Sequence, residues 1–157
     1  MSKMKKYFFL LLIMLPSIFN ECRADKPANA SITGTSGNNV VVQMTNETFK
    51  KVVFNYEVSK EWKFEGNKPA IIDFYADWCP PCRQLSPLVE EIAKEYSGKI
   101  DVYKVDTDKE TTLAQALGIT NLPTLLFIPA KGKPQITMGA IPKDSLVKAI
   151  NEILLIK

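Results

Sequence analysis

The chain has 157 residues, of which 46% are hydrophobic and 24% are charged, a composition typical of one globular domain with a packed core. This balance excludes fibrous and intrinsically disordered classes. The chain contains no histidine, which excludes a histidine general base, a metal site with histidine ligands and a haem held by histidine.

The first 24 residues have the features of a secretory signal peptide. Three lysines form a short positive region at its start: Lys3, Lys5 and Lys6. An apolar run over 7–15 follows and ends at Pro16, so it is shorter than the ~20 apolar residues of a membrane-spanning helix. We expect cleavage after Ala24, because Cys22 and Ala24 place small side chains three residues and one residue before that bond. An uncleaved membrane anchor is the alternative.

Cys22 supports a second hypothesis for the N-terminus. A cysteine just behind an apolar run can be the lipid-anchored first residue of a bacterial lipoprotein, but here Asn20 and Glu21 precede it instead of small residues. Residues 25–39 are rich in Gly, Ser and Asn and predict a flexible linker. The folded domain is then expected over 40–157.

The net charge of +3 comes from the same N-terminal segment. Residues 1–24 contain four of the 20 basic residues and one of the 17 acidic residues, so their removal leaves 16 of each. A net charge of zero gives no reason to expect a nucleic acid as partner.

The rest of the chain alternates between strand and helix patterns. We expect strands over 40–44, 70–76, 100–106, 125–128 and 135–138. Helices are expected to begin at about Asn46, to start at the Cys79–Cys82 pair and end at Gly98, to cover 109–117 and to begin again at about Lys143. The order βαβαβαββα indicates a layered α/β domain whose closing hairpin supplies antiparallel strands.

Cys79 and Cys82 form a Cys-x-x-Cys pair between the apolar strand 70–76 and an amphipathic helix. Zinc would need two more Cys or His ligands, which the chain after residue 24 lacks, and haem attachment would need His in place of Arg83. A purely structural disulfide of this spacing closes too small a loop to restrain the unfolded chain much. The pair therefore indicates a redox centre, without metal or cofactor.

The two cysteines are expected to have different roles. Cys79 lies at the helix N-terminus, where free backbone N–H groups and the macrodipole favour the thiolate. We expect Cys79 to attack a substrate disulfide, and Cys82, one turn further and more buried, to resolve the mixed disulfide.

The segment 72–82 resembles the active-site region of the thioredoxin family, with Pro80 in place of the Gly of the typical Cys-Gly-Pro-Cys. The resemblance extends over roughly 40–157 and includes, in order, Pro87, Lys104, Asp106, the segment 119–124, Gly139 and Ala140. It implies a thioredoxin fold, which is an α/β structure with a central mixed β-sheet flanked by helices on both faces. It also implies a monomeric protein-disulfide oxidoreductase.

The resemblance assigns roles to further residues. Asp73, a carboxylate in an apolar strand, is expected to have a raised pKa and to accept the proton of Cys82. Lys104 would modulate the pKa of Asp73, and Pro123 would be a cis proline facing the cysteines. The contact surface for protein substrates is expected from Trp78, Ile119, Leu122, Gly139 and Ala140.

The direction of electron flow is predicted from the residues between the cysteines. Pro81 stands where oxidases and isomerases often have His, which favours a reductase, while Pro80 leaves the reduction potential open. With the signal peptide, this predicts reduction of protein disulfides outside the cytoplasm, in the periplasm of a bacterium, with electrons from a membrane protein or a reductase. Three alternatives stay open: a thiol reductant for cytochrome c maturation, a disulfide oxidase or isomerase, and a redox-inert thioredoxin-like binding module.

Overall fold

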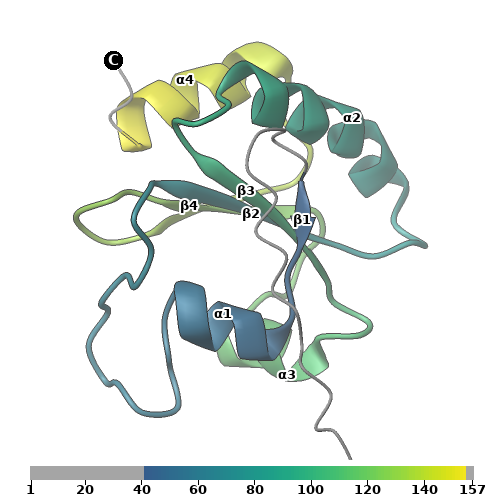
Figure 1. Cartoon of the computed structure of the whole chain (residues 1–157). Coiled ribbons are helices and arrows are strands. Elements are labelled where there is room, and N and C mark those ends of the chain that lie inside the picture. Colours follow the sequence, from purple (N-terminus) through teal and green to yellow (C-terminus); the bar gives the residue numbers. More distant parts are fainter. Residues whose placement is uncertain (1–40, 155–157) are drawn as a thin grey trace, which may run out of the picture. The chain divides into compact units, whose positions relative to one another are not determined.

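The computed structural model describes residues 41–154 (Figure 1). The expected signal peptide (1–24), the expected linker (25–39) and Cys22 lie outside these residues. Within 41–154, none of the helices has the length and apolar character needed to cross a membrane.

In the described part of the chain, five strands form one mixed sheet in the order β1-β3-β2-β4-β5. The strands are β1 (Val42–Gln43), β2 (Ala70–Tyr75), β3 (Asp101–Asp106), β4 (Thr124–Ile128) and β5 (Gln135–Met138). β1 and β2 run parallel to β3, whereas β4 is antiparallel to both β2 and β5. β2 lies at the centre and is buried from Ala70 to Phe74, which explains its almost continuously apolar sequence.

Within residues 41–154, four helices cover the sheet: α1 (Asn46–Val52), α2 (Pro80–Glu95), α3 (Thr111–Ala116) and α4 (Lys143–Ile153). α2 and α4 lie on one face, and α1 and α3 lie on the other (Figure 1). The element order and the two covered faces confirm the expected α/β class and its architecture.

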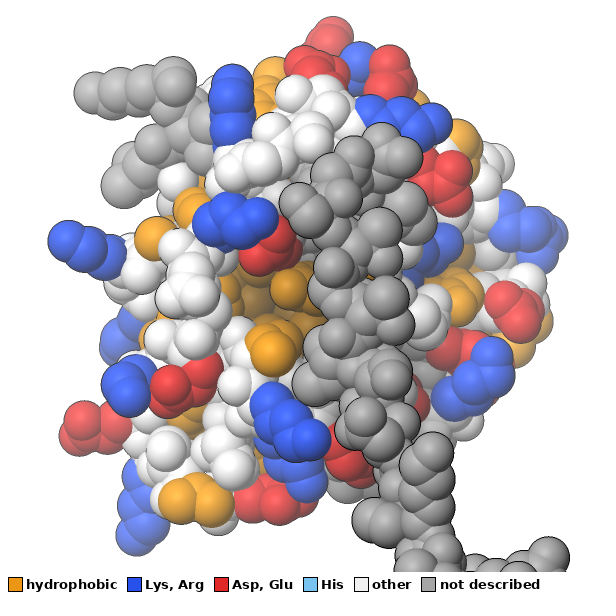
Figure 2. All heavy atoms as spheres, viewed as in Figure 1, with side chains coloured by type: hydrophobic (Ala, Val, Ile, Leu, Met, Phe, Trp, Pro, Cys, Tyr) orange, Lys and Arg blue, Asp and Glu red, His pale blue; other side chains and the backbone are white. Residues whose placement is uncertain are grey.

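Each face of the sheet has its own hydrophobic core. Ile71 of β2 packs with the apolar side of α2, including Leu85 and Ile92, and with α4. Its neighbour Ile72 points to the opposite face and packs with Phe49 of α1, because successive side chains of a strand alternate. On the surface seen in Figure 2, basic and acidic side chains are interspersed.

Several elements are shorter than the sequence predicts, and α2 ends at Glu95 instead of Gly98. β1 covers only Val42–Gln43, because the Met44 side chain turns into the core and Thr45 already caps α1, with its hydroxyl accepting the N–H of Thr48 at 3.2 Å. α3 begins at Thr111, since the N–H groups of Lys109 and Glu110 bond to the Asp106 carbonyl in a preceding turn.

Candidate active site

Cys79 follows the loop after β2 and is the N-cap residue of α2. Pro80 and Pro81 occupy the first two helical positions, where a missing N–H costs no intrahelical bond. The Cys82 N–H donates to Cys79 Sγ at 3.2 Å. This bond and the helix macrodipole both favour negative charge on the Cys79 sulfur.

The two cysteines form a disulfide within the first turn of α2. Each is 3% exposed, so the expectation that Cys82 is more buried than Cys79 is wrong for the oxidised protein. The reason is that both sulfurs share one turn, and Tyr75 and Leu122 pack against the cluster they form with Ala76. The cysteines differ in the hollows that they line.

Cys79 lines a surface hollow of about 400 Å³. The other lining residues come from the start of α2 and from two loops: Trp78, Pro80, Pro81, Thr107 and 119–122. Three residues of the predicted substrate surface, Trp78, Ile119 and Leu122, thus meet at Cys79. Gly139 and Ala140 do not line this hollow; the Gly139 N–H donates to the carbonyl of Pro123, the residue after Leu122, at 2.7 Å.

The Leu122–Pro123 peptide bond is cis. Pro123 directly precedes β4 and is buried, whereas Leu122 is half-buried and contacts the cysteine cluster. The turn before β4 is held by Thr124, whose hydroxyl donates to the Asn121 carbonyl at 2.7 Å. The structure therefore brings Pro123 and the Cys pair to the same end of the sheet.

Trp78 is 67% exposed, and its indole is held in place by an acid that the sequence analysis missed. Its Nε1 donates to both carboxylate oxygens of Asp108, at 2.9 and 3.2 Å. The Asp108 N–H in turn donates to Asp106 Oδ1 at 3.1 Å. A signal for Asp108 is its place two residues after Asp106, the last residue of β3, because the loops after the parallel neighbours β2 and β3 emerge at the same edge of the sheet.

Asp106 is buried and anchors this loop. Burial alone would raise its pKa, but the Lys109 ammonium at 2.7 Å and the backbone N–H of Asp108 hold the pKa of Asp106 below its ordinary value. Asp106 is thus a charged anchor for the loop that carries Asp108, which is a structural role beside the cysteines.

Asp73 lies in the centre of β2 and is 1% exposed. Neither of its carboxylate oxygens has a hydrogen-bond partner within the described residues. Burial raises the pKa of Asp73 from 3.8 to about 6, and the Lys104 ammonium offsets part of that rise. The carboxyl group therefore exchanges protons near neutral pH, in agreement with the raised pKa expected from the sequence.

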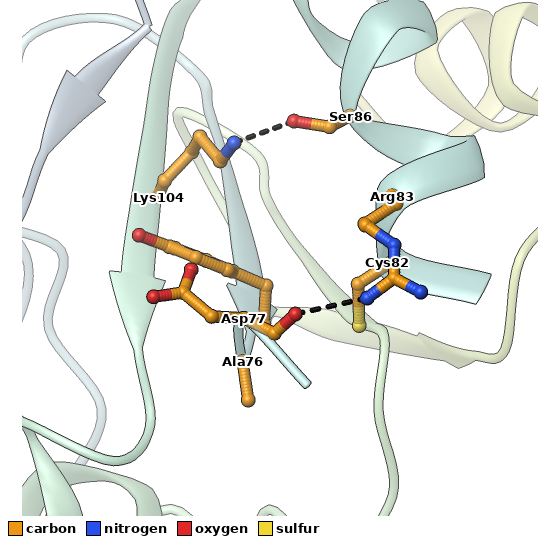
Figure 3. A pocket seen from close by; sticks show the side chains of 7 residues that line it. Ala76, Asp77, Cys82, Arg83, Ser86 and Lys104 are labelled. Carbon is orange, nitrogen blue, oxygen red and sulfur yellow. Dashed lines mark hydrogen bonds between the residues drawn. The ribbon is translucent and has the colours of Figure 1, made fainter. Parts of the chain in front are cut away.

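Cys82 lines a second cavity of about 160 Å³, on the α2 side of the sheet (Figure 3). The other lining residues are Tyr75, Ala76, Asp77, Arg83, Ser86 and Lys104. Lys104 Nζ donates to Ser86 Oγ and lies 4.7 Å from the centroid of the Tyr75 ring. Arg83 donates to the Asp77 carbonyl at 3.0 Å (Figure 3). The sequence analysis did not single out Tyr75 or Ser86.

The described part of the chain contains no cluster of three His, Cys, Asp or Glu side chains able to hold a metal ion. Two thiols that open and close a ring within one helical turn transfer two electrons by thiol–disulfide exchange. The site is therefore that of a thiol–disulfide oxidoreductase.

Comparison with known proteins agrees with this class. The family model named Thioredoxin matches residues 40–152, and the chain belongs to the thioredoxin family. A thioredoxin of Borreliella burgdorferi is 48% identical over 113 residues, which are 72% of this chain and 97% of that protein. A thioredoxin of Pyropia yezoensis is 39% identical over 73% of this chain and 97% of its own length. The crystal structure of chloroplastic thioredoxin z superposes with a TM-score of 0.62 at 27% identity, over 72% of this chain and 93% of that one.

Proposed function

We propose that this protein reduces disulfides of protein substrates outside the cytoplasm. We infer the reductive direction from the hydrogen bonds to the Cys79 sulfur, which stabilise its thiolate only modestly. It accepts one backbone N–H, from Cys82, and the chain has no histidine that could add a charged donor. A strongly stabilised thiolate favours the dithiol form and makes an oxidant, and such stabilisation is missing from this set of contacts.

In the first step, the Cys79 thiolate attacks one sulfur of the substrate disulfide. The Cys79–substrate bond forms, the substrate S–S bond breaks, and the second substrate sulfur leaves as a thiolate that takes up a proton. Trp78, Ile119 and Leu122 offer the apolar contact surface, with Gly139 and Ala140 beside it. The backbone of Leu122, next to Pro123, pairs with an extended segment of the substrate.

In the second step, Cys82 resolves the mixed disulfide. The Cys82 thiol gives its proton to the Asp73 carboxylate, directly or through a water molecule, and its sulfur attacks Cys79 Sγ. The Cys79–substrate bond breaks, and the reduced substrate leaves with both electrons of the dithiol. The Cys79–Cys82 disulfide of the structure is the product, and Lys104 tunes the acidity of Asp73.

The setting outside the cytoplasm rests on residues 1–24, whose pattern is that of a signal peptide for the bacterial periplasm. Because that compartment is oxidising, the proposal includes an electron donor, a membrane protein or a reductase, that returns the disulfide to the dithiol. The protein acts as a monomer in this scheme, and no bound cofactor enters either step.

Reduction potential and trapping test the proposal together. We expect a potential near about −270 mV, as for thioredoxin, and catalysed reduction of insulin disulfides. A potential near about −120 mV without insulin reduction would contradict the reductive direction. In cells, Cys82→Ser should hold substrates as mixed disulfides on Cys79, and Cys79→Ser should hold none.

The identity of the trapped proteins separates the alternatives. Proteins with varied disulfides support a general reductase, and capture restricted to apocytochrome c would indicate the dedicated reductant. If Cys79→Ala left all cellular activity intact, the protein would be a redox-inert binding module and the proposal would fail.

A further inference from the structure

Lys104 and Asp73 face each other on neighbouring parallel strands. The register pairs Asp73 of β2 with Lys104 of β3, and both side chains lie on the face that α2 covers. An ammonium and a buried carboxylate in this relation would be expected to pair, because pairing offsets the cost of burial. Both Asp73 oxygens nevertheless lack a hydrogen-bond partner among the described residues.

The ammonium of Lys104 is instead held by two residues of the Cys82 cavity. Lys104 Nζ donates to Ser86 Oγ, which projects from the first half of α2 (Figure 3). It also lies 4.7 Å from the centroid of the Tyr75 ring, a cation–π contact. Tyr75 is itself held by its hydroxyl, which donates to Gln43 Oε1 of β1 at 3.4 Å.

Asp77 and Arg83 also line the cavity with charged side chains, but Lys104 is the charged group that shifts the pKa of Asp73. β4 presents the apolar Leu125 opposite Asp73, and α2 brings Cys82 and Arg83 to the cavity, where Arg83 bonds to the Asp77 carbonyl. Burial sets most of the base strength of the Asp73 carboxylate, and the position of the Lys104 ammonium adjusts it: a close ion pair weakens the base, and a withheld ammonium strengthens it.

We infer that Ser86 and Tyr75 are positioning residues that withhold the Lys104 ammonium from Asp73, so that Asp73 can accept the proton of Cys82 at neutral pH. The inference rests on the proposed role of Asp73. It assigns to Ser86 a task in the resolution step, although Ser86 itself touches neither the substrate nor the reacting sulfurs in this scheme. Burial is the main cause of the raised pKa of Asp73, about 6, and the Lys104 ammonium offsets only part of that rise.

The test is the titration of Asp73 in the oxidised full-length protein, in which the cysteines do not titrate. Ser86→Ala should release Lys104 toward Asp73 and lower the midpoint of the Asp73 carboxyl resonance by about one pH unit. The rate of mixed-disulfide resolution at neutral pH should fall by roughly threefold, because a weaker base accepts the Cys82 proton less well. Alanine suits a helix interior, so the variant is expected to fold.

Three further variants make the result specific. Ser86→Thr keeps the hydroxyl and should restore the parent midpoint, and Ser145→Ala, an exposed change on α4, should leave it unmoved. In a Lys104→Met background, Ser86→Ala should have no effect on the midpoint, because the charge it positions is gone. An unchanged midpoint in folded Ser86→Ala, or an equal shift with and without Lys104, would overturn the inference. Failure of the proposed function looks different: Asp73→Asn would then resolve mixed disulfides at the parent rate.

Discussion

The burial of the Asp73 carboxyl group favours its proposed role as a base but lowers the stability of the folded protein. Its carboxyl group sits in the centre of β2, 1% exposed, and the described residues offer its oxygens no hydrogen bond. Ionising a carboxyl group in such a place costs free energy, and that cost raises the pKa of Asp73 to about 6. The same cost makes the carboxylate a stronger base, as the proposed proton transfer from Cys82 requires.

The cost of ionising the buried Asp73 carboxyl group predicts how the free energy of unfolding depends on pH. The folded-state pKa of Asp73, about 6, lies above the ordinary value of 3.8, so between these values the folded protein keeps a proton that the unfolded chain releases. The free energy of unfolding therefore falls as pH rises through that window, by up to about 3 kcal/mol. Asp73→Asn does not titrate and should be more stable than the parent by about that amount at neutral pH, with little difference at about pH 4.

Urea denaturation of the oxidised protein at several pH values measures this effect. Glu90→Gln, an exposed change on α2, serves as the control and should follow the parent at each pH. Equal stability of Asp73→Asn and the parent at neutral pH would mean that the buried carboxyl group is not the source of the pH dependence.

At the scale of elements, the start of α2 determines the properties of Cys79. The sulfur accepts its hydrogen bond from Cys82, at the third helical position, and Pro80 lies at the first position. The proline at the site where the family typically has glycine therefore does not remove the donor seen in the structure. Its main effect is to restrict the backbone before the helix.

Pro80→Gly tests this view of the helix start. We expect the free energy of unfolding to fall by about 1 kcal/mol, because glycine gives the unfolded chain more conformational freedom. The pKa of Cys79 in the reduced protein should change little, since the Cys82 N–H remains in place. Urea denaturation and thiolate absorbance measure the two effects, with Pro142→Gly at the N-cap of α4 as the matched control. A rise of the thiolate fraction by about tenfold would show that the backbone N–H gained in Pro80→Gly is a further donor to the sulfur.

The sequence predicts α2 and β2 correctly because a single hydrophobic pattern dominates in each of them. The apolar spacing from Leu85 onward marks α2, and the continuous apolar run of β2 marks a strand buried on both faces. The position of the Cys pair between them also follows from the sequence alone. These features depend on neighbours along the chain, so local patterns are sufficient to find them.

Contacts between distant segments were not predictable in the same way. The Asp108 carboxylate that holds Trp78 and the Ser86 hydroxyl that holds Lys104 belong to elements that only the fold brings together. The equal burial of Cys79 and Cys82 has the same origin, because Leu122 packs against the cluster from a separate loop. Serine in a helix and aspartate after a strand are common in sequences, and their partners become visible only in three dimensions.

At the scale of the whole molecule, the balance of charge separates the N-terminal segment from the domain. Residues 1–24 hold four basic residues and one acidic residue, and the remainder has 16 of each. Both signs are interspersed on the surface seen in Figure 2. Under the proposed export, the basic residues near the N-terminus belong to the signal peptide and not to a binding surface of the domain.

Export predicts a definite mass for the mature protein. Because small side chains precede the bond after Ala24, the chain should begin at Asp25 and be recovered in the soluble fraction outside the cytoplasm. Intact-mass measurement of the soluble and membrane fractions of the native host tests this, with Cys22→Ser as the companion variant.

If Cys22 is removed with the signal peptide, the Cys22→Ser variant is recovered with the mass of the parent protein and in the same fraction. If Cys22 carries lipid, the parent protein is found in the membrane fraction and the Cys22→Ser variant in the soluble fraction. A full-length mass in the cytoplasm would contradict both forms of the export hypothesis and would place the reductase among cytoplasmic thioredoxins.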